Sequence, residues 1–174
     1  MCILKIDLSL WCKCNQSKSK KMAKLILTAG LTGAGKSTII RKIGLSEMLC
    51  ANSDSILEAH PDYNPKRPEL LHEWAKIENQ KQIYKFMAEG SDFIIDGTGT
   101  NVERYAKYIN DARELGYEIE MIYVQVKLET AIERNAKRER TVPVEVIYEK
   151  AAVIETTVQA IGSMCDKFVT INND

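Results

Sequence analysis

The residues that are the clearest candidates for a chemical role lie in a glycine-rich segment, residues 30–37. It reads Gly-Leu-Thr-Gly-Ala-Gly-Lys-Ser, a full match to the G-x-x-x-x-G-K-S/T phosphate-binding pattern. Its glycines allow the backbone to turn several N–H groups inward around phosphate oxygens. In this pattern Lys36 brings a positive charge near the β- and γ-phosphates, and the Ser37 hydroxyl can ligate Mg²⁺. The segment therefore predicts a site for a nucleoside triphosphate with Mg²⁺.

The residues around the glycine-rich segment support this interpretation. Residues 24–29 form a short apolar run typical of a buried parallel strand, and residues 38–43 have helical composition and end at Gly44. A strand, a glycine loop and a helix N-terminus together make an anion site from unpaired backbone donors. The predicted nucleotide-binding residues are Gly30, Leu31, Thr32, Gly33, Ala34, Gly35, Lys36, Ser37 and Thr38.

Two aspartates lie at the ends of the next two predicted strands: Asp54 follows the strand at 48–52, and Asp96 is the last residue of the strand at 92–96. Because ligands of a parallel sheet bind outside the carboxyl ends of its strands, both are candidate site residues. Asp54 is predicted to be a catalytic base that takes a proton from an attacking hydroxyl, and also the N-cap of a short helix at 55–59. Asp96 is predicted to face the Mg²⁺ shell or the acceptor substrate.

The segment after Asp96 reads Gly-Thr-Gly-Thr-Asn. Its glycines allow close approach to a ligand, and Thr98 offers a hydroxyl to the acceptor. The alternative is a tight turn before the next helix, capped by Thr100 or Asn101.

Arginines gather at the end of a charged helix predicted at 128–139. Arg134 and Arg138 are four residues apart and share a helix face, and Arg140 precedes the break that Pro143 imposes. We expect this segment to be a mobile lid whose arginines stabilise transition-state charge on the γ-phosphate, with Arg138 and Arg140 also binding the nucleotide. The alternative is a solvated helix end whose arginines pair with neighbouring glutamates.

The remaining pattern alternates strands with helices, which predicts a parallel α/β sheet. Helices are expected at 68–89, 102–115, 128–139 and 144–161, and further strands at 117–126 and 167–172. On the first of these helices, the predicted core-facing stripe consists of Leu70, Leu71, Trp74, Ile77, Tyr84 and Met87. Residues 1–21 differ in character from the rest, so a flexible or non-native extension is expected before a single domain at 22–174.

Composition excludes several classes of protein. The chain of 174 residues has 24 basic and 24 acidic side chains, so its net charge provides no global steering toward nucleic acid or anionic membrane. It contains no apolar run long enough to span a membrane and no signal-peptide layout, so a cytoplasmic protein is expected. Five irregularly spaced cysteines do not form a disulfide framework, and no second cysteine pair completes a zinc site with Cys12 and Cys14.

Residues 24–161 resemble the P-loop kinases that include zeta-toxin-like kinases and phage polynucleotide 5′-kinases. The run from Asp54 to Pro61 resembles the zeta-type segment in which the aspartate is the base and a His-Pro pair follows. Asp96-Gly97-Thr98-Gly99 is similar to the zeta-type Glu-Gly-Thr-Gly, whose acid and threonine hold the acceptor sugar. Residues 134–138 and 142–143 resemble the lid of polynucleotide kinases. Those enzymes, however, carry a phosphate-gripping arginine where this chain has Leu57.

The resemblance implies a P-loop NTPase fold with a five-stranded parallel sheet, helices on both faces and a helical arginine lid. It also implies ATP-dependent phosphorylation of an alcohol, with Mg²⁺ and with a small molecule such as a nucleotide sugar as acceptor. A polynucleotide 5′-hydroxyl kinase is the alternative. A nucleotide-dependent switch is a third interpretation, since Asp96-x-x-Gly99 fits a GTPase motif, but the chain lacks the guanine-reading Asn-Lys-x-Asp motif. An antitoxin-like protein partner is compatible with the resemblance, although no residue pattern supports it.

Overall fold

The computed structural model describes residues 22–174. The predictions for residues 1–21, including the extension and the cysteines at positions 12 and 14, lie outside the described residues. Within residues 22–174, no helix combines the length and the apolar composition that crossing a membrane requires.

Five parallel strands form one sheet in the order β2-β3-β1-β4-β5. The strands are β1 (Lys24–Ala29), β2 (Leu49–Ala51), β3 (Phe93–Asp96), β4 (Glu118–Gln125) and β5 (Lys167–Asn172). The helices are α2 (Lys36–Lys42), α3 (Ser53–Glu58), α4 (His72–Glu89), α5 (Val102–Glu114), α6 (Leu128–Ala136) and α7 (Val144–Gly162), with a 3₁₀ turn, η1 (Pro68–Leu71), before α4. This arrangement confirms the predicted parallel α/β fold.

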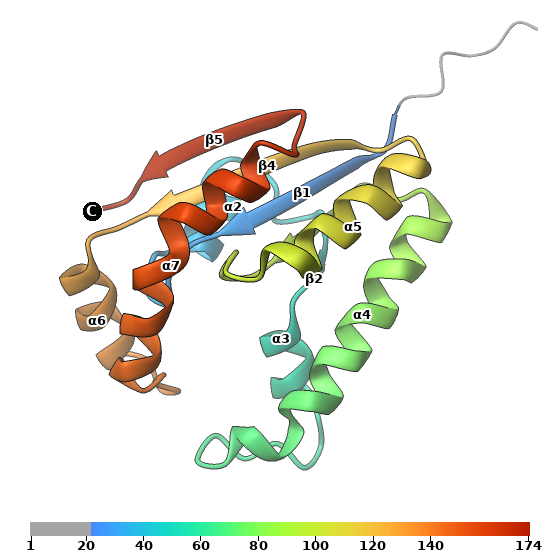
Figure 1. The fold of residues 1–174 in the computed structure, drawn as a ribbon. Coiled ribbons are helices and arrows are strands. Elements are labelled where there is room, and N and C mark those ends of the chain that lie inside the picture. The colour runs from blue at the N-terminus through green and yellow to red at the C-terminus, as the bar shows by residue number, and fades with distance from the viewer. Residues whose placement is uncertain (1–21) are drawn as a thin grey trace, which may run out of the picture.

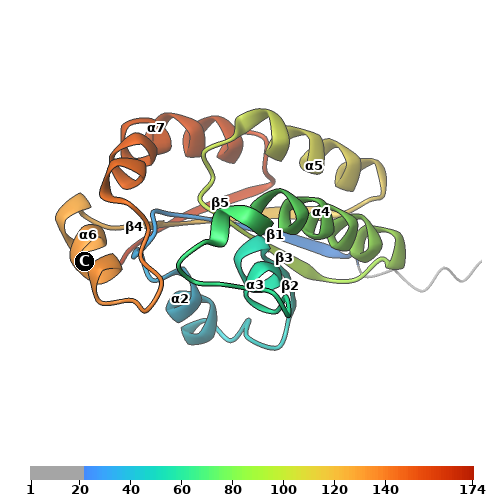
Figure 2. The same ribbon diagram turned by 90° about the horizontal axis from the view of Figure 1, so that it is seen from below.

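Helices cover both faces of the sheet (Figure 2). The larger core lies between the sheet and α4, α5 and α7, and includes Phe93, Ile109 and Val158. A smaller core, which includes Ile39, lies between the sheet and α2. β1 and β3 are buried on both sides, which explains why their sequences are mostly apolar rather than alternating.

The sheet places the loops that carry chemistry next to one another. β1 lies between β3 and β4, and Thr28 of β1 pairs in register with Asp96 of β3. Because all five strands run in the same direction, the loops that follow β1, β2 and β3 meet at the carboxyl edge. In Figure 1, α3 and the start of α4 extend below this edge on one side, and α6 with the loop to α7 lies on the other.

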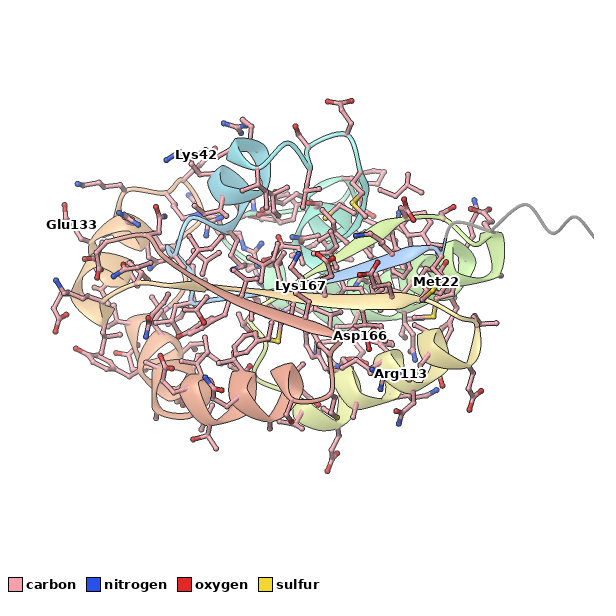
Figure 3. The ribbon with its side chains drawn as sticks, turned by 90° about the horizontal axis from the view of Figure 1, so that it is seen from above. Met22, Lys42, Arg113, Glu133, Asp166 and Lys167 are labelled. Carbon is pink, nitrogen blue, oxygen red and sulfur yellow. The ribbon has the colours of Figure 1, made fainter. Side chains whose placement is uncertain are left out.

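The far edge strand, β5, is fixed at its start by one carboxylate. Asp166 accepts a hydrogen bond from the Ile119 backbone N–H at 2.8 Å and pairs with Arg113 of α5 at 3.1 Å. Figure 3 shows Arg113 and Asp166 beside each other at the turn that leads into β5. This anchoring sets where β5 begins, and therefore where the chain arrives after β5, close to the phosphate-binding loop.

The predicted core stripe of the helix at 68–89 is wrong in part. Trp74 is 37% exposed and contacts His60 edge-on, with ring centroids 4.5 Å apart, while Leu70 and Ile77 are exposed. The buried residues of α4 are Ala75, Ile83, Phe86 and Met87, so the prediction is confirmed for Met87. The first half of α4 extends past the sheet edge, so no sheet surface is available to cover its apolar side chains.

Candidate nucleotide and acceptor site

One cavity of about 940 Å³ lies at the carboxyl edge of the sheet. The phosphate-binding loop (residues 30–37) lines one part of it, and the loops after β2 and β3 line its centre. α4 and α5 form a second wall, and the arginine lid (residues 134–143) contributes Arg134 and Arg138. The cavity therefore joins most of the predicted site residues in a single space.

The phosphate-binding loop has the backbone shape of an anion cradle. Gly35 is the N-cap of α2 in the left-handed conformation, with φ +83°, and no side chain caps the helix. The first N–H groups of α2 are consequently available to an anion. A Cβ at Gly33 would collide with the backbone oxygen of Ala131, and one at Gly35 would lie 2.5 Å from the side-chain nitrogen of Asn173. Leu31 and Ala34 of this loop are buried.

Lys36 lies at the centre of this loop, half-buried, and its Nζ donates to the carbonyl oxygen of Gly30 at 3.0 Å. Burial lowers the pKa of Lys36, and the charges of Asp96 and Asp54 oppose this effect in part. The lysine is thus a partly desolvated cation that a phosphate group could neutralise.

The predicted N-cap role of Asp54 is wrong, because α3 begins two residues earlier than expected. Asn52 is the N-cap, and its side-chain oxygen accepts from the N–H groups of Asp54 and Ser55. Asp54 instead lies in the first turn of α3 and lines the cavity, with its side chain 67% exposed. An exposed carboxylate in this position can be reached by a ligand in the cavity.

Asp96 is held from both sides. The Thr28 hydroxyl donates to one of its carboxylate oxygens at 2.5 Å, and the Asn52 amide donates to the other at 2.7 Å. Thr28 is almost fully buried, so this donor cannot turn away to water. Each carboxylate oxygen keeps one lone pair, and Asp96 lines the cavity together with Ser37.

The oxygen atoms near the phosphate-binding loop are suitable ligands for Mg²⁺. Residues 22–174 contain no cluster of three or more His, Cys, Asp or Glu placed to hold a metal. Mg²⁺ does not require such a cage, because it is usually bound by one or two protein oxygens together with substrate phosphates. The Ser37 hydroxyl and the Asp96 carboxylate supply oxygens of this kind.

The loop after Asp96 is attached to the phosphate-binding loop. The Thr98 carbonyl accepts from the Gly30 N–H at 3.2 Å, and the Thr98 hydroxyl is 3.0 Å from that of Thr100. Tyr105 lies against Gly97, and burial raises its pKa, so its phenol stays protonated beside Asp96. Of the two predicted caps for the next helix, Asn101 is the one that caps α5, through the Arg104 N–H.

The lid arginines have different partners. Arg134 donates to the backbone oxygen of Asn173 at 2.9 Å, whereas Arg138 lines the cavity with an exposed side chain. Arg140 pairs with Asp54 at 3.2 Å and Glu58 at 3.3 Å, on the α3 side of the cavity. Its predicted role in nucleotide binding would therefore require the lid to move.

A buried asparagine shapes the lid. Asn135 donates to the carbonyl oxygen of Val142 at 2.8 Å and accepts from its N–H at 3.0 Å. This pair of bonds closes the loop that carries Arg138 and Arg140. Sequence reasoning missed Asn135 because a polar residue in a charged helix gives no sign of burial.

The wall formed by α4 and α5 presents three cations, and only one of them lacks an acidic partner. Lys76 pairs with Glu73, and Lys107 with Asp111. Arg104 makes no side-chain hydrogen bond or salt bridge within residues 22–174, although it lines the same cavity. The sequence indicated none of these residues, because their meeting depends on how the two helices pack.

The chain matches a known protein family over residues 25–159, and that family is described as an AAA domain. The chain belongs to the AAA domain family. The match covers the phosphate-binding loop, both aspartates and the lid, and it agrees with the predicted P-loop kinase group.

Solved structures with the same fold include toxin, RNA-repair and kinase proteins. The AAA domain is similar, at 21% identity and a TM-score of 0.74, to a chain of the PezAT chromosomal toxin-antitoxin system of Streptococcus pneumoniae, with 96% of this chain and 75% of that chain covered. A chain of the Pnkp1/Rnl/Hen1 RNA repair complex has 19% identity and a TM-score of 0.62, with 83% and 48% covered. Shikimate kinase from Acinetobacter baumannii, in complex with shikimate, has 16% identity and a TM-score of 0.54, with 91% and 89% covered.

Proposed function

We propose that this AAA domain is an ATP-dependent kinase that transfers the γ-phosphoryl group to a hydroxyl of a small molecule such as a nucleotide sugar. The proposal rests on one observation, the cavity that joins the phosphate-binding loop to Asp54 and Asp96. A phosphate donor in the loop and an acceptor beside the two carboxylates would share this space. Kinases are among the proteins with the same fold, which supports the reaction class.

Two features favour a small acceptor over a polynucleotide. A volume of about 940 Å³ is at the upper end of small-molecule sites, which suits a nucleotide together with a compact acceptor. Leu57, at the position where polynucleotide kinases carry an arginine, is only 1% exposed and packs into the interior. No phosphate-gripping side chain is therefore available at that position.

The charge of the cavity favours an acceptor with an anionic group of its own. Lysines and arginines outnumber carboxylates among the lining residues, although the whole chain has no net charge. Some of this positive charge would bind the phosphates of ATP at the phosphate-binding loop. Arg104 lies on the wall formed by α4 and α5. Its guanidinium pairs with no acid within residues 22–174 and can bind a phosphate or carboxylate on the acceptor.

In the proposed reaction, Asp54 accepts the proton of the acceptor hydroxyl. The acceptor oxygen then bonds to the γ-phosphorus while the bond from that phosphorus to the β–γ bridging oxygen breaks, and ADP leaves. Lys36 and the N–H groups at the start of α2 hold the β- and γ-phosphates, and Arg134 and Arg138 neutralise charge on the transferred group. Thr98 and Asp96 orient the acceptor.

Magnesium, bound by Ser37 and Asp96, would neutralise charge on the β- and γ-phosphates. Arg140 must release Asp54 during the cycle, because its guanidinium is hydrogen-bonded to the carboxylate that would accept the proton. Movement of Arg140 from Asp54 toward the nucleotide would free the base when ATP is bound.

The test is transfer of label from γ-³²P-ATP to a panel of UDP-sugars and, in parallel, to an oligonucleotide with a 5′-hydroxyl. Magnesium-dependent labelling of a sugar nucleotide, lost in Lys36→Met, supports the proposal. If only the oligonucleotide were labelled, the proposed small-molecule kinase activity would be wrong, and the chain would be a polynucleotide 5′-hydroxyl kinase. A chain that binds no ATP with Mg²⁺ in calorimetry is not a kinase.

A further inference from the structure

Asn52 uses both ends of its side-chain amide at the centre of the site. Its nitrogen donates to Asp96 at 2.7 Å, and its oxygen accepts from the backbone N–H groups of Asp54 at 2.7 Å and Ser55 at 3.1 Å. This orientation of the amide is the one that satisfies all three bonds, because a reversed amide would direct an oxygen at a carboxylate and an NH₂ group at two N–H donors.

The sheet register brings these groups together. Ala51 of β2 pairs with Ile95 of β3, so the next residues, Asn52 and Asp96, leave the sheet side by side. Thr28 of β1 pairs with Asp96 from the opposite side. A continuous set of hydrogen bonds therefore crosses the ends of three adjacent strands, from β1 through Asp96 to the first turn of α3.

Besides Asn52, both α4 and Arg140 contact α3. The strand before it, β2, has three residues, and its Leu49 is 44% exposed at the sheet edge. The helix itself has six residues, and its single buried side chain, Leu57, is on its last turn. The side chain of Asp54 is mostly in solvent. The amide of Asn52 is thus the direct side-chain link between the backbone of Asp54 and the carboxylate of Asp96.

We propose that Asn52 is a positioning residue for phosphoryl transfer, which sets the placement of Asp54 relative to Asp96. This inference rests on the proposed function, since it assigns Asp54 to the attacking hydroxyl and Asp96 to the acceptor and metal. Asn52 itself need not touch either substrate. Its two roles, capping α3 and holding Asp96, can be separated by substitution.

Asn52→Ser separates them because serine is as good an N-cap as asparagine, whereas its hydroxyl is too short to reach Asp96 while it caps the helix. Asn52→Ala removes both roles. The matched control is Asn64→Ser, the same change in an asparagine whose oxygen accepts only from the Lys66 N–H in an exposed turn.

The readout is the slow hydrolysis of ATP, in which water replaces the acceptor and Asp54 takes its proton, giving ADP and phosphate. We expect Asn52→Ser to lower kcat about 10- to 100-fold, as small misplacements in active sites do, with ATP affinity within about twofold of wild type. Its melting temperature should stay within about 2 °C of wild type, whereas Asn52→Ala should also lose about 2–4 °C through the missing cap. Asn64→Ser should match wild type in kcat.

Wild-type turnover in Asn52→Ser would overturn the proposal, as would equal losses of kcat, ATP affinity and melting temperature, which indicate a structural role. A second measurement does not depend on activity. In ¹⁵N NMR the Asn52 side-chain amide should exchange slowly with solvent, and Asp96→Ala should remove this protection. If wild type binds no ATP, the proposed function fails, and the amide signal alone then decides whether Asn52 holds Asp96.

Discussion

Replacing Asp54 by alanine tests the proposed general base. Loss of a positioned base lowers kcat by about 10²–10⁴, which corresponds to about 2.7–5.4 kcal/mol of activation free energy. The same substitution breaks the ion pair with Arg140, but the Asp54 side chain is 67% exposed, so this pair contributes at most about 1 kcal/mol to stability. We therefore expect a large loss in rate, a melting temperature within about 4 °C of wild type and an almost unchanged affinity for ATP.

Glu133→Gln is the matched control for this experiment. The side chain of Glu133 is also 67% exposed and is also paired with a cation, Lys137, but it does not line the cavity. Figure 3 shows Glu133 at the outer margin of the molecule. Steady-state kinetics would give kcat, and titration calorimetry the affinity for ATP, for wild type, Asp54→Ala and Glu133→Gln. If Asp54→Ala lost rate and ATP affinity in equal measure, or if Glu133→Gln were as slow, the assignment of Asp54 as base would be refuted.

Three further predictions concern charge, acceptor and lid. Lys36→Met should abolish ATP binding in calorimetry yet leave the thermal stability at pH 7 unchanged or higher, because burial lowers the pKa of Lys36 and its charged form opposes folding. In wild type, Lys36 should make the stability rise with pH between its lowered pKa in the folded state and the ordinary value of 10.5. Thermal melts over that pH range would detect this rise. Arg104→Gln should raise KM for a phosphorylated acceptor about tenfold or more, because the lost hydrogen bond to the acceptor phosphate is charge-assisted. KM for ATP should stay the same. Equal effects on both substrates would contradict the role of Arg104 in acceptor binding. Asn135→Ala should lower the free energy of unfolding by about 1–3 kcal/mol in urea melts, because the Val142 N–H and carbonyl lose their partner. An unchanged free energy of unfolding would mean that water replaces the asparagine.

The order and type of the secondary structure elements could be read from the sequence, because short apolar runs separated by amphipathic segments have few alternative packings. The strand at 167–172 was predicted with the bounds that β5 has. Boundaries that depend on caps were less accurate. The helix after β2 begins at Ser53 because Asn52, rather than Asp54, accepts its first N–H groups. Asn is among the strongest N-cap residues, so a signal for this start was present.

The exposed face of α4 and the partners of the lid arginines could not be predicted from periodicity. Trp74 and Ile77 have helical spacing, yet both are exposed: Ile77 lines the cavity, and Trp74 contacts His60. Arg140 follows the lid pattern, but its partners Asp54 and Glu58 are more than 80 residues away in the chain. Nothing local in the sequence distinguishes such a contact from solvent exposure.

By itself, the sequence predicted a phosphate-binding loop, because the need for inward N–H groups favours glycines, a lysine and a hydroxyl at the spacing of residues 30–37. It also determined that acids follow the neighbouring strands. Only the tertiary structure decided how those acids are held. The register of three strands brings Thr28 and Asn52 to the two oxygens of Asp96. The packing of α4 against α5 brings Arg104 to the cavity that Asp96 lines. These contacts join segments far apart in the chain, so their geometry depends on the sheet and not on local residue patterns.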